Sequence, residues 1–329
     1  DDSKYNKENK LLLSVHLYIP YDFALKPDMK ISEFTDETKN SMVNVFKNLY
    51  FKYIQQGIHI VVGEMGTINK NNTADREFWG ILYLSSARRF QFSAFIWDNG
   101  IYDNSKTCEE TFGQFIRSEL SWVNDELIDS YIMMAKQPLA DNPDAYRIDL
   151  VETFETLGMD IDYGKVEWDD EITADDIVEE MGLGWNLGNT FDAYNNTQNQ
   201  GLSSENVWDN PTTTEEMIDE IVDRGFKAIR IPVTWHNHLI DSNYTIDPIW
   251  MARVKTVVDW CINKGLYVIL NTHHDNANYR AYGSRYGVGY YPMTKDMVES
   301  EKFLYNIWKQ IAYAFNDGYD HHLIFEALN

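Results

Sequence analysis

The stretch from residue 226 to residue 275 decides the fold. It begins with FKAIRIPVTW (226–235) and ends with LYVILNTHHD (266–275), two apolar runs with the length and composition of buried strands. Asp247-Pro248 lies between them and opens a helical segment. The apolar residues of that segment share one side at helical spacing: Val254, Val257, Val258, Cys261 and Ile262. This order of strand, helix and strand predicts a βαβ unit with two parallel strands.

The same alternation extends to both sides of this unit. Strand patterns recur at GLGWNLGNT (182–190) and HHLIFEALN (321–329), and near the start of the chain at LLLSVHLYI (11–19), IHIVVGEMG (58–66) and FSAFIWDNG (92–100). Helical patterns separate these strands. Repeated strand–helix units predict an α/β fold in which a parallel sheet has helices outside it.

One segment interrupts the alternation. Residues 136–172 contain Pro138, Pro143 and many acidic residues with little periodicity, which indicates a linker or a wrapping extension. Just before it, FIRSELSWVNDELIDSYIMMAK (115–136) predicts a helical ending for the first part of the chain. The predicted segments are therefore 1–135, 136–172 and 173–329.

The composition limits the partners. A chain of 329 residues with 44% hydrophobic residues can bury a large core, and its formal net charge of −24 repels nucleic acid phosphates and anionic membranes. We therefore expect a neutral substrate, no nucleic acid and no membrane. The 10 Trp and 21 Tyr residues suit stacking against sugar rings, but a large aromatic core explains them equally well. Apolar runs are too short to span a bilayer, and the polar residues 1–10 do not resemble a signal peptide.

Polar and aromatic residues follow the predicted strands where each strand ends. An apolar core would reject them, whereas the carboxyl ends of parallel strands form the active site of a barrel enzyme. Glu64 is the sharpest example, because it follows the run IVV and lies between Gly63 and Gly66. A carboxylate there is costly unless it is paired or functional. It suits a catalytic nucleophile that a cation holds ionised, and the alternative is a structural ion pair with an arginine.

Other strand-end residues have both a functional and a structural explanation. His16 and Tyr18 are two residues apart on a strand and therefore face the same side. They could contact one sugar together, or they could pack in the core. Trp97 could stack against a sugar ring, or it could be an ordinary core residue.

The sequence does not predict a metal site. The run His273-His274-Asp275 suggests one at first sight, but adjacent side chains on a strand point to opposite faces, so one ion cannot readily bind both histidines. Substrate binding by one histidine and packing by the other is the expectation. Cys108 and Cys261 make neither a zinc-binding spacing nor a disulfide framework.

Seven stretches together resemble the strand-end motifs of one enzyme family. They are GWNLGNTFDA, FKAIRIPVTWHNHL, VILNTHHD, IFEALN, SVHLYIPYDFAL, VVGEMG and SSARRFQFSAFIWDNG, and they span most of residues 11–100 and 182–329. On these motifs the chain resembles glycoside hydrolase family 5, in its broad-specificity endo-β-1,4-glucanase and xyloglucanase branch. The resemblance implies a (β/α)8 TIM barrel that hydrolyses β-1,4-glucosidic bonds with retention of configuration.

The resemblance also implies roles for individual residues. Glu64 would be the catalytic nucleophile, Arg230 would hold it ionised, and His16 with Tyr18 would orient it. Trp97 would stack under the sugar at the cleavage point. The other substrate-binding residues that it implies are Asn189, Trp235, His273, His274 and Asn329. It implies no cofactor and no metal.

The order of the two halves departs from the family. There the segment that begins GWNLGNT comes first, whereas here it follows the segments with HLY, GEMG and IWDNG. In barrel order the chain supplies strands six, seven, eight, one, two, three and four, and strand five is not evident. Either a fragment of two tandem modules or a circular permutant would have this order, and we favour the tandem origin.

The general acid is the second departure. In the family, the asparagine that corresponds to Asn329 is followed at once by the acid/base glutamate, and this sequence ends at Asn329. Retaining hydrolysis requires two carboxyl groups about 5–5.5 Å apart. Glu326 lies on the same strand but about 13 Å from the expected position, so we expect it to be a poor substitute.

These observations predict a retaining endo-β-1,4-glucanase that acts on cellulose, mixed-linkage β-glucan or xyloglucan, with a β-glucan polysaccharide or oligosaccharide as its partner. Two alternatives stay open. One is a non-catalytic glycan-binding protein that lacks the acid, and the other is a mannan- or xylan-directed enzyme of the same fold. The resemblance also implies secretion or display at the cell surface, and it allows for further catalytic or carbohydrate-binding modules in the parent protein.

Overall fold

The computed structural model describes most of the chain. The described residues are 9–27, 34–103, 110–136, 172–194, 201–276, 289–290 and 297–329. The linker predicted at 136–172 lies outside them except for its two end residues, and so does Cys108. Two compact units make up the chain: unit 1 comprises Asp1–Ala94 with Asp129–Leu183, and unit 2 comprises Phe95–Ile128 with Gly184–Asn329.

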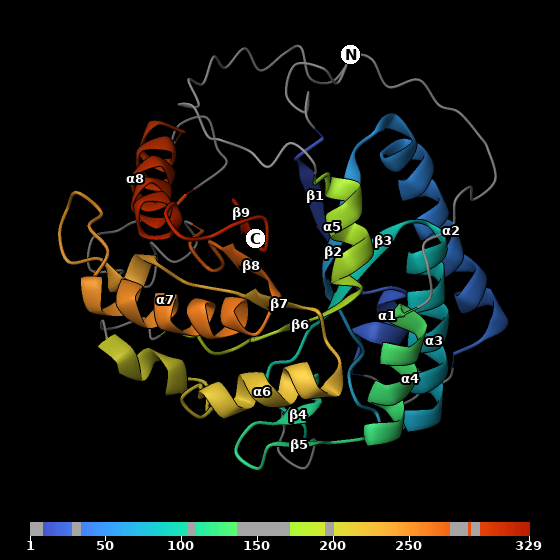
Figure 1. The fold of residues 1–329 in the computed structure, drawn as a ribbon. Helices are drawn as coiled ribbons and strands as arrows, with labels where there is room; N and C mark the ends of the chain where they lie inside the picture. The colour runs from blue at the N-terminus through green and yellow to red at the C-terminus, as the bar shows by residue number, and fades with distance from the viewer. Residues whose placement is uncertain are drawn as a thin grey trace. The chain divides into compact units, whose positions relative to one another are not determined.

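Unit 1 is built on parallel strands with helices beside them (Figure 1). Its strands follow the order β1 (Leu12–His16), β2 (His59–Met65) and β3 (Phe92–Ile96), and β3 continues into unit 2. β1 and β2 pair in parallel. The helices are α1 (Tyr21–Ala24), α2 (Asp36–Lys52), α3 (Thr73–Arg89), α5 (Ala174–Met181) and the larger part of α4 (Asp125–Ala135), with a 3-10 turn, η2, at Ile54–Gln56.

Local sequence signals explain where these helices begin and end. Thr35 caps α2, since its hydroxyl accepts a hydrogen bond from the amide of Thr38. α2 ends at Lys52, and the 3-10 turn η2 that follows ends at Gly57, whose φ of 80° is a conformation that glycine adopts without strain. At the start of α5, Thr173 and Asp176 form a reciprocal capping box.

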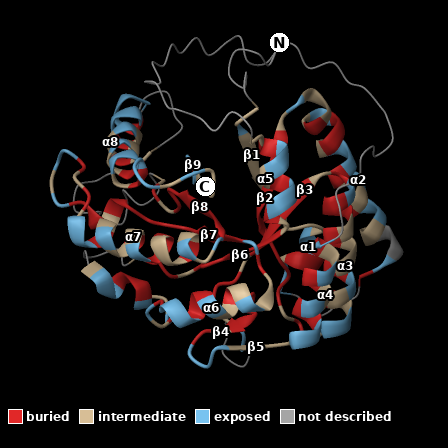
Figure 2. Ribbon diagram, viewed as in Figure 1, coloured by how far each residue is buried: buried red, intermediate tan, exposed pale blue. Residues whose placement is uncertain are grey.

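The core of unit 1 lies between the strands and the long helices. β2 is buried along its whole length, which is the pattern of a strand covered on both faces. The ring of Phe46 meets Tyr83 of α3 edge-to-face at 4.8 Å and Phe92 of β3 at 5.3 Å between centroids. Burial colours show β2 and β3 buried, β1 intermediate, and helices that carry both buried and exposed residues (Figure 2).

Unit 2 continues the alternation of strand and helix. From β3 the sheet order continues through β6 (Leu183–Asn186), β7 (Ala228–Ile231), β8 (Tyr267–Asn271) and β9 (Leu323–Glu326), and the pairs from β6 to β9 are parallel. The helices are α6 (Glu215–Arg224), α7 (Pro248–Asn263) and α8 (Met297–Phe315), with 3-10 turns η3 (Gly201–Asn206) and η4 (His236–His238). The βαβ unit predicted at 226–275 is confirmed by β7, α7 and β8.

The helix of this βαβ unit begins where its sequence predicts, and it buries the apolar side that its sequence predicts. The Asp247 side chain accepts a hydrogen bond from the amide of Ile249, and Pro248 is the first residue of α7. The buried residues of α7 are Trp250, Val254, Val257, Val258 and Cys261. Cys261 is a free thiol, as expected, and burial raises its pKa, so it is an inert core residue.

The helix predicted at 115–136 is shorter than expected. The stretch begins with a small antiparallel hairpin, β4 (Phe115–Ile116) and β5 (Ser121–Trp122), and α4 starts only at Asp125. Asn124 precedes it and accepts a hydrogen bond from the amide of Leu127 through its side-chain oxygen. This cap, which the sequence interpretation overlooked, explains why the helix does not extend backwards.

The predicted α/β class is confirmed, since β1–β2 and β6–β9 pair in parallel and helices alternate with them along the chain. No helix in the described stretches is long and apolar enough to cross a lipid bilayer.

Candidate active site

Glu64 lies near the end of β2. It contacts two side chains at the end of β1: His16, the last residue of that strand, and Tyr18, two residues further on. The strand register places it beside His16, where a bulge after Val15 shifts the pairing by one residue. The Tyr18 hydroxyl donates a hydrogen bond to Oε2 of Glu64 at 2.9 Å, and Nδ1 of His16 lies 3.4 Å from the same oxygen. Glu64 is 7% exposed. The structure therefore brings together the three residues predicted for the nucleophile and its orienting partners.

The backbone around this group is fixed by buried neighbours. The Tyr83 hydroxyl donates a hydrogen bond to the carbonyl of Leu17 at 2.9 Å. Burial raises the pKa of Tyr83, which keeps this donor protonated. Gly63 lets the strands approach closely, because a Cβ there would lie 2.9 Å from Oγ of Ser14 and 3.3 Å from Nε2 of His16. The contact between His16 and Glu64 therefore depends on a glycine beside it.

Arg230 forms a second group, which lies within unit 2. It is fully buried and donates from Nε to Oε2 of Glu326 at 2.8 Å, from Nη1 to Oδ1 of Asn186 at 2.9 Å and from Nη2 to Oδ1 of Asn329 at 2.8 Å. Asn271 donates to the same Glu326 oxygen at 2.9 Å. Strands β6 to β9 each contribute one member of this group, so it ties their ends together.

One predicted substrate-binding residue, Asn329, thus has defined partners, whereas one predicted pairing stays open. Asn329 is held both by Arg230 and by the hydrogen bond from its own amide to the carbonyl of Thr272 at 3.1 Å. Arg230 and Glu64 belong to different units, so the role of Arg230 in keeping Glu64 ionised stays a prediction.

Trp97 and Asn189 lie on two loops of unit 2 that a buried arginine connects. Arg117 donates from Nη2 to the carbonyl of Asp98 at 2.9 Å and to the carbonyl of Gly188 at 3.0 Å. Its guanidinium also lies 3.5 Å from the carboxylate of Asp98. Burial lowers the pKa of Arg117 and the charge of Asp98 raises it, so the pair compensates the burial of both charges. This bridge positions the loops that carry Trp97 and Asn189.

His273 and Trp97 lie face to face, whereas Trp235 is a core residue. The rings of His273 and Trp97 are stacked, with centroids 5.8 Å apart and planes 6° apart. The Trp235 side chain is completely buried and donates its indole N–H to the carbonyl of Asn271 at 2.9 Å. A buried ring offers no face to a sugar in this structure, and the substrate contact of Trp235 stays a prediction.

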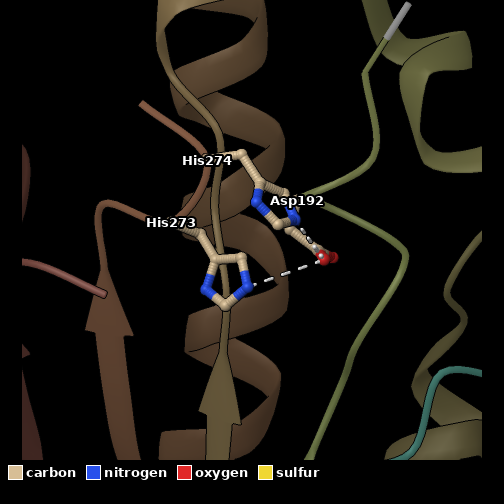
Figure 3. Close-up of side chains that lie close together, drawn as sticks. All are labelled: Asp192, His273 and His274. Atoms are coloured by element: carbon tan, nitrogen blue, oxygen red, sulfur yellow. Dashed lines mark ion pairs between the residues drawn. The ribbon is translucent and has the colours of Figure 1, made fainter. Parts of the chain in front are cut away.

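The argument that placed His273 and His274 on opposite faces is wrong. Both imidazoles turn toward the carboxylate of Asp192 (Figure 3), with Nε2 of His274 3.6 Å and Nε2 of His273 4.0 Å from Oδ2. The reason is local, because β8 ends at Asn271 and the alternation of a strand does not extend beyond it. These three residues are a set that could hold a metal ion.

His274 also belongs to a group of aromatic rings. Its members are Tyr194, Trp208, His236 and His274, with ring centroids between 5.4 and 5.7 Å apart for the pairs in contact. Sequence reasoning missed Tyr194 and Trp208, and it also missed Asp98, Arg117 and Asp192. Tyr194 and Asp192 directly follow the GWNLGNT motif, and that position was the available signal.

Comparisons with known proteins agree on one family. A family model described as Cellulase (glycosyl hydrolase family 5) matches residues 1–103 and 190–329. Endoglucanase B of Ruminococcus albus is 48% identical over 160 residues, which are 48% of this chain and 35% of that protein. Endoglucanase A of Clostridium longisporum is 47% identical over 163 residues, which are 48% of this chain and 28% of that protein.

A solved structure of a broad-specificity endoglucanase from Ruminococcus champanellensis, with bound cellotriose, is 38% identical, with a TM-score of 0.43, over 48% of this chain and 43% of that one. The chain spans about a third of the length of the two curated relatives named above, 35% and 28%.

Proposed function

Because this chain belongs to the cellulase family, glycosyl hydrolase family 5, we propose that it cleaves internal β-1,4-glucosidic bonds of a β-glucan by double displacement, with Glu64 as the nucleophile. Its α/β fold is of the TIM-barrel class, in which catalytic residues lie at the carboxyl ends of the strands. Glu64 has that position on β2.

The contacts of the Glu64 carboxylate carry the proposal. A nucleophilic carboxylate must be ionised and fixed in direction, and hydrogen bonds to the charged form favour both. Tyr18 donates to Oε2 at 2.9 Å, and the imidazole of His16 lies 3.4 Å from that oxygen. The hydroxyl and the ring together orient the carboxylate and limit its rotation.

In the proposed reaction, the Glu64 carboxylate attacks the anomeric carbon and forms a glycosyl ester while the bond to the leaving sugar breaks. A second carboxyl group, about 5–5.5 Å away, protonates the leaving oxygen. The family resemblance assigns this role to a glutamate directly after the position of Asn329. The same group then takes a proton from water, which attacks the ester and frees both the sugar and Glu64. Two inversions at one carbon retain its configuration.

Glu326 is a poor candidate for that second group. Its Oε2 accepts hydrogen bonds from the guanidinium of Arg230 at 2.8 Å and from the amide of Asn271 at 2.9 Å. An acid must carry a proton, whereas two donors on one oxygen, one of them cationic, favour the ionised form. We assign Glu326 to holding Arg230 in place.

The charge and the relatives support a neutral glucan as substrate. A formal net charge of −24 disfavours anionic polymers and does not oppose a neutral one. The related structure from Ruminococcus champanellensis contains cellotriose. We therefore propose cellulose, mixed-linkage β-glucan or xyloglucan, with Trp97, Asn189, His273, His274 and Asn329 as binding residues.

Three further expectations belong to this proposal. Secretion or display at the cell surface would bring the enzyme to a polymer that does not enter cells. Further catalytic or carbohydrate-binding modules fit a chain that matches 35% of its Ruminococcus albus relative. A reversed order of the two halves fits the order of the sequence motifs, and the residues that flank this chain in its gene would test it.

Trapping of the glycosyl ester tests the nucleophile directly. The probe is a dinitrophenyl 2-deoxy-2-fluoro-β-cellobioside, whose activated leaving group needs little protonation, so ester formation depends mainly on the nucleophile. Trypsin releases Glu64 in the peptide 53–70, where it is the sole acidic residue. We expect one 2-fluorocellobiosyl group on that peptide and none after Glu64→Gln.

The other outcomes separate the alternatives. Label on a different peptide would remove Glu64 from the role of nucleophile. Binding of cello-oligosaccharides with neither label nor turnover would favour a non-catalytic glycan-binding protein. Faster turnover of mannan or xylan than of β-glucan and xyloglucan would keep the mechanism and overturn the substrate.

A further inference from the structure

Asp192, His273 and His274 converge within unit 2 from two different loops. Asp192 follows β6, whereas the two histidines follow β8 (Figure 3). One donor atom from each residue lies within 4.8 Å of the others. Asp192 is completely buried, His273 is 3% exposed, and the side chain of His274 is 26% exposed. The group is therefore preformed, with one member open to solvent.

The Asp192 carboxylate is satisfied on one oxygen only. Oδ1 accepts a hydrogen bond from the amide of Thr190 at 2.8 Å, which fixes the orientation of the carboxylate. Oδ2 is buried and has no hydrogen-bond partner among the described residues. It lies near both Nε2 atoms, at 3.6 Å from His274 and 4.0 Å from His273. The charge of the buried Arg117 acts on Asp192, but its guanidinium donates to Thr190 and to the carbonyls of Asp98 and Gly188. A buried carboxylate oxygen without a hydrogen bond is costly, so this arrangement favours a bound cation.

We propose that Asp192, His273 and His274 bind a divalent transition-metal ion, with Zn²⁺ as the best match. Two imidazoles and one carboxylate are ligands that zinc accepts, whereas calcium and magnesium prefer oxygen alone. In a tetrahedral zinc site with bonds of about 2.0–2.1 Å, ligand atoms are about 3.3 Å apart. The two Nε2 to Oδ2 separations of 3.6 and 4.0 Å exceed that value by less than an ångström. The partly exposed ring of His274 can move to close the site.

The tautomer of His273 limits the affinity of this site for the metal ion. Oδ1 of Asn271 accepts a hydrogen bond from the amide of Val233 at 3.1 Å, so Nδ2 of Asn271 is the donor that lies 3.2 Å from Nδ1 of His273. The neutral imidazole therefore carries its proton on Nε2, the atom that would bind the metal. Binding requires the other tautomer or a turned ring, and the lost hydrogen bond lowers the affinity on the order of tenfold to a hundredfold.

A second group of the same residue types could compete with this site for the metal ion. Asp320, His321 and His322 also bring one donor atom each within 4.8 Å, but Asp320 is exposed and the histidines are half-buried. Nδ1 of His322 lies 3.0 Å from Oδ1 of its neighbour Asp320. The test must remove this set before the buried one is measured.

The experiment uses the untagged chain with His321→Ala and His322→Ala, freed of metal by a chelator. Zn²⁺ is titrated by calorimetry, and Co²⁺ is used as a probe because its visible spectrum reports imidazole ligands in tetrahedral geometry. We expect one site per chain. His274→Ala should weaken binding at least about tenfold, because it removes one of three ligands, and Asp192→Asn should abolish the tetrahedral cobalt spectrum.

Two results would overturn the proposal. One is equal zinc affinity with and without His274. The other is loss of all binding when only His321 and His322 are replaced. Near-ultraviolet circular dichroism checks that each variant is folded. If Asp192→Asn does not fold, the zinc affinity of His274→Ala alone still tests the proposal. The side chain of His274 is partly exposed, so we expect this variant to fold. Neither readout depends on glucanase activity, so failure of this proposal and failure of the proposed function are distinguishable.

Discussion

Two carboxylates lie at strand ends, one in each unit, and they are almost equally buried: Glu64 is 7% exposed and Glu326 is 8% exposed. Their partners differ. One oxygen of Glu64 meets a hydroxyl and an imidazole, at 2.9 and 3.4 Å. One oxygen of Glu326 meets a guanidinium and an amide, at 2.8 and 2.9 Å.

The difference indicates two distinct uses of a buried acid. A full cationic partner neutralises Glu326 and makes it part of a scaffold that ties four strands together. A hydroxyl and an imidazole orient Glu64 instead, which suits a carboxylate that attacks a carbon atom. Burial alone therefore does not identify a catalytic carboxylate, whereas the chemistry of its partners separates the two. Substitutions in each group can break or sharpen this comparison.

The largest expected effect is on activity, from Glu64→Gln. The amide keeps the shape of the side chain but cannot form the glycosyl ester, so kcat/KM on an activated aryl cellobioside should fall at least about a thousandfold. The melting temperature should change little. A near-normal rate would refute the nucleophile, and a modest loss of rate with a large fall in melting temperature would identify Glu64 as a structural residue.

The second effect is on stability, from Glu326→Gln. This change breaks the buried ion pair between Arg230 and Glu326, so the free energy of unfolding should fall by about 3–5 kcal/mol in urea denaturation. Asp125→Asn is the matched control. It breaks the ion pair of Asp125 with Arg224 at 2.6 Å, but the Asp125 side chain is 68% exposed, so the loss should stay below about 1 kcal/mol. Equal losses in the two variants would contradict the scaffold role.

How far the sequence predicts this molecule depends on the kind of feature. The strands and helices follow from periodicity and end signals, as Asp247-Pro248 and Gly57 illustrate. His16, Tyr18 and Glu64 could be placed together because strand ends converge and alternate residues share a face. These inferences use local rules that the fold does not override.

The errors occurred where a local rule was carried past its element. Opposite faces for His273 and His274 assumed a strand that ends at Asn271. The helix predicted from Phe115 ignored the cap at Asn124. Arg117 was missed for another reason: its role lies in joining the Asp98 and Gly188 carbonyls, 19 and 71 residues away in sequence. No single-sequence pattern reports such a pairing.

The third prediction concerns the hydrogen bond from Tyr18 to Glu64. Tyr18→Phe removes one donor to a charged carboxylate and keeps the ring, so kcat/KM should fall about tenfold, equivalent to about 1.4 kcal/mol. Tyr83→Phe is the control, because it removes a hydroxyl that bonds the carbonyl of Leu17 and does not touch the carboxylate. It should lower stability more than rate. The opposite pattern in the two variants would mean that Tyr18 only packs.

The smallest expected effect is on the pH dependence of stability, and it comes from His238, a buried histidine of unit 2. His238 stacks on Trp250 with centroids 3.6 Å apart, and burial, followed by the charge of His236, lowers its pKa to about 3. Its ring nitrogens have no hydrogen-bond partner among the described residues. The folded pKa is below the unfolded value of about 6.5, so the unfolded chain binds the proton first as the pH falls. The stability contributed by neutral His238 is complete above pH 6.5 and is lost progressively toward pH 3.

His238→Phe tests this argument, since it keeps an aromatic ring on Trp250 and removes the proton. Between pH 6 and pH 5, the natural chain should lose roughly 1 kcal/mol more of its free energy of unfolding than the variant does. Urea denaturation at each pH measures the difference. Trp308→Phe is the control, because an indole has no titratable group and its loss should leave the slope nearly unchanged. Parallel pH profiles for the natural chain and His238→Phe would show that His238 does not titrate as a buried neutral group.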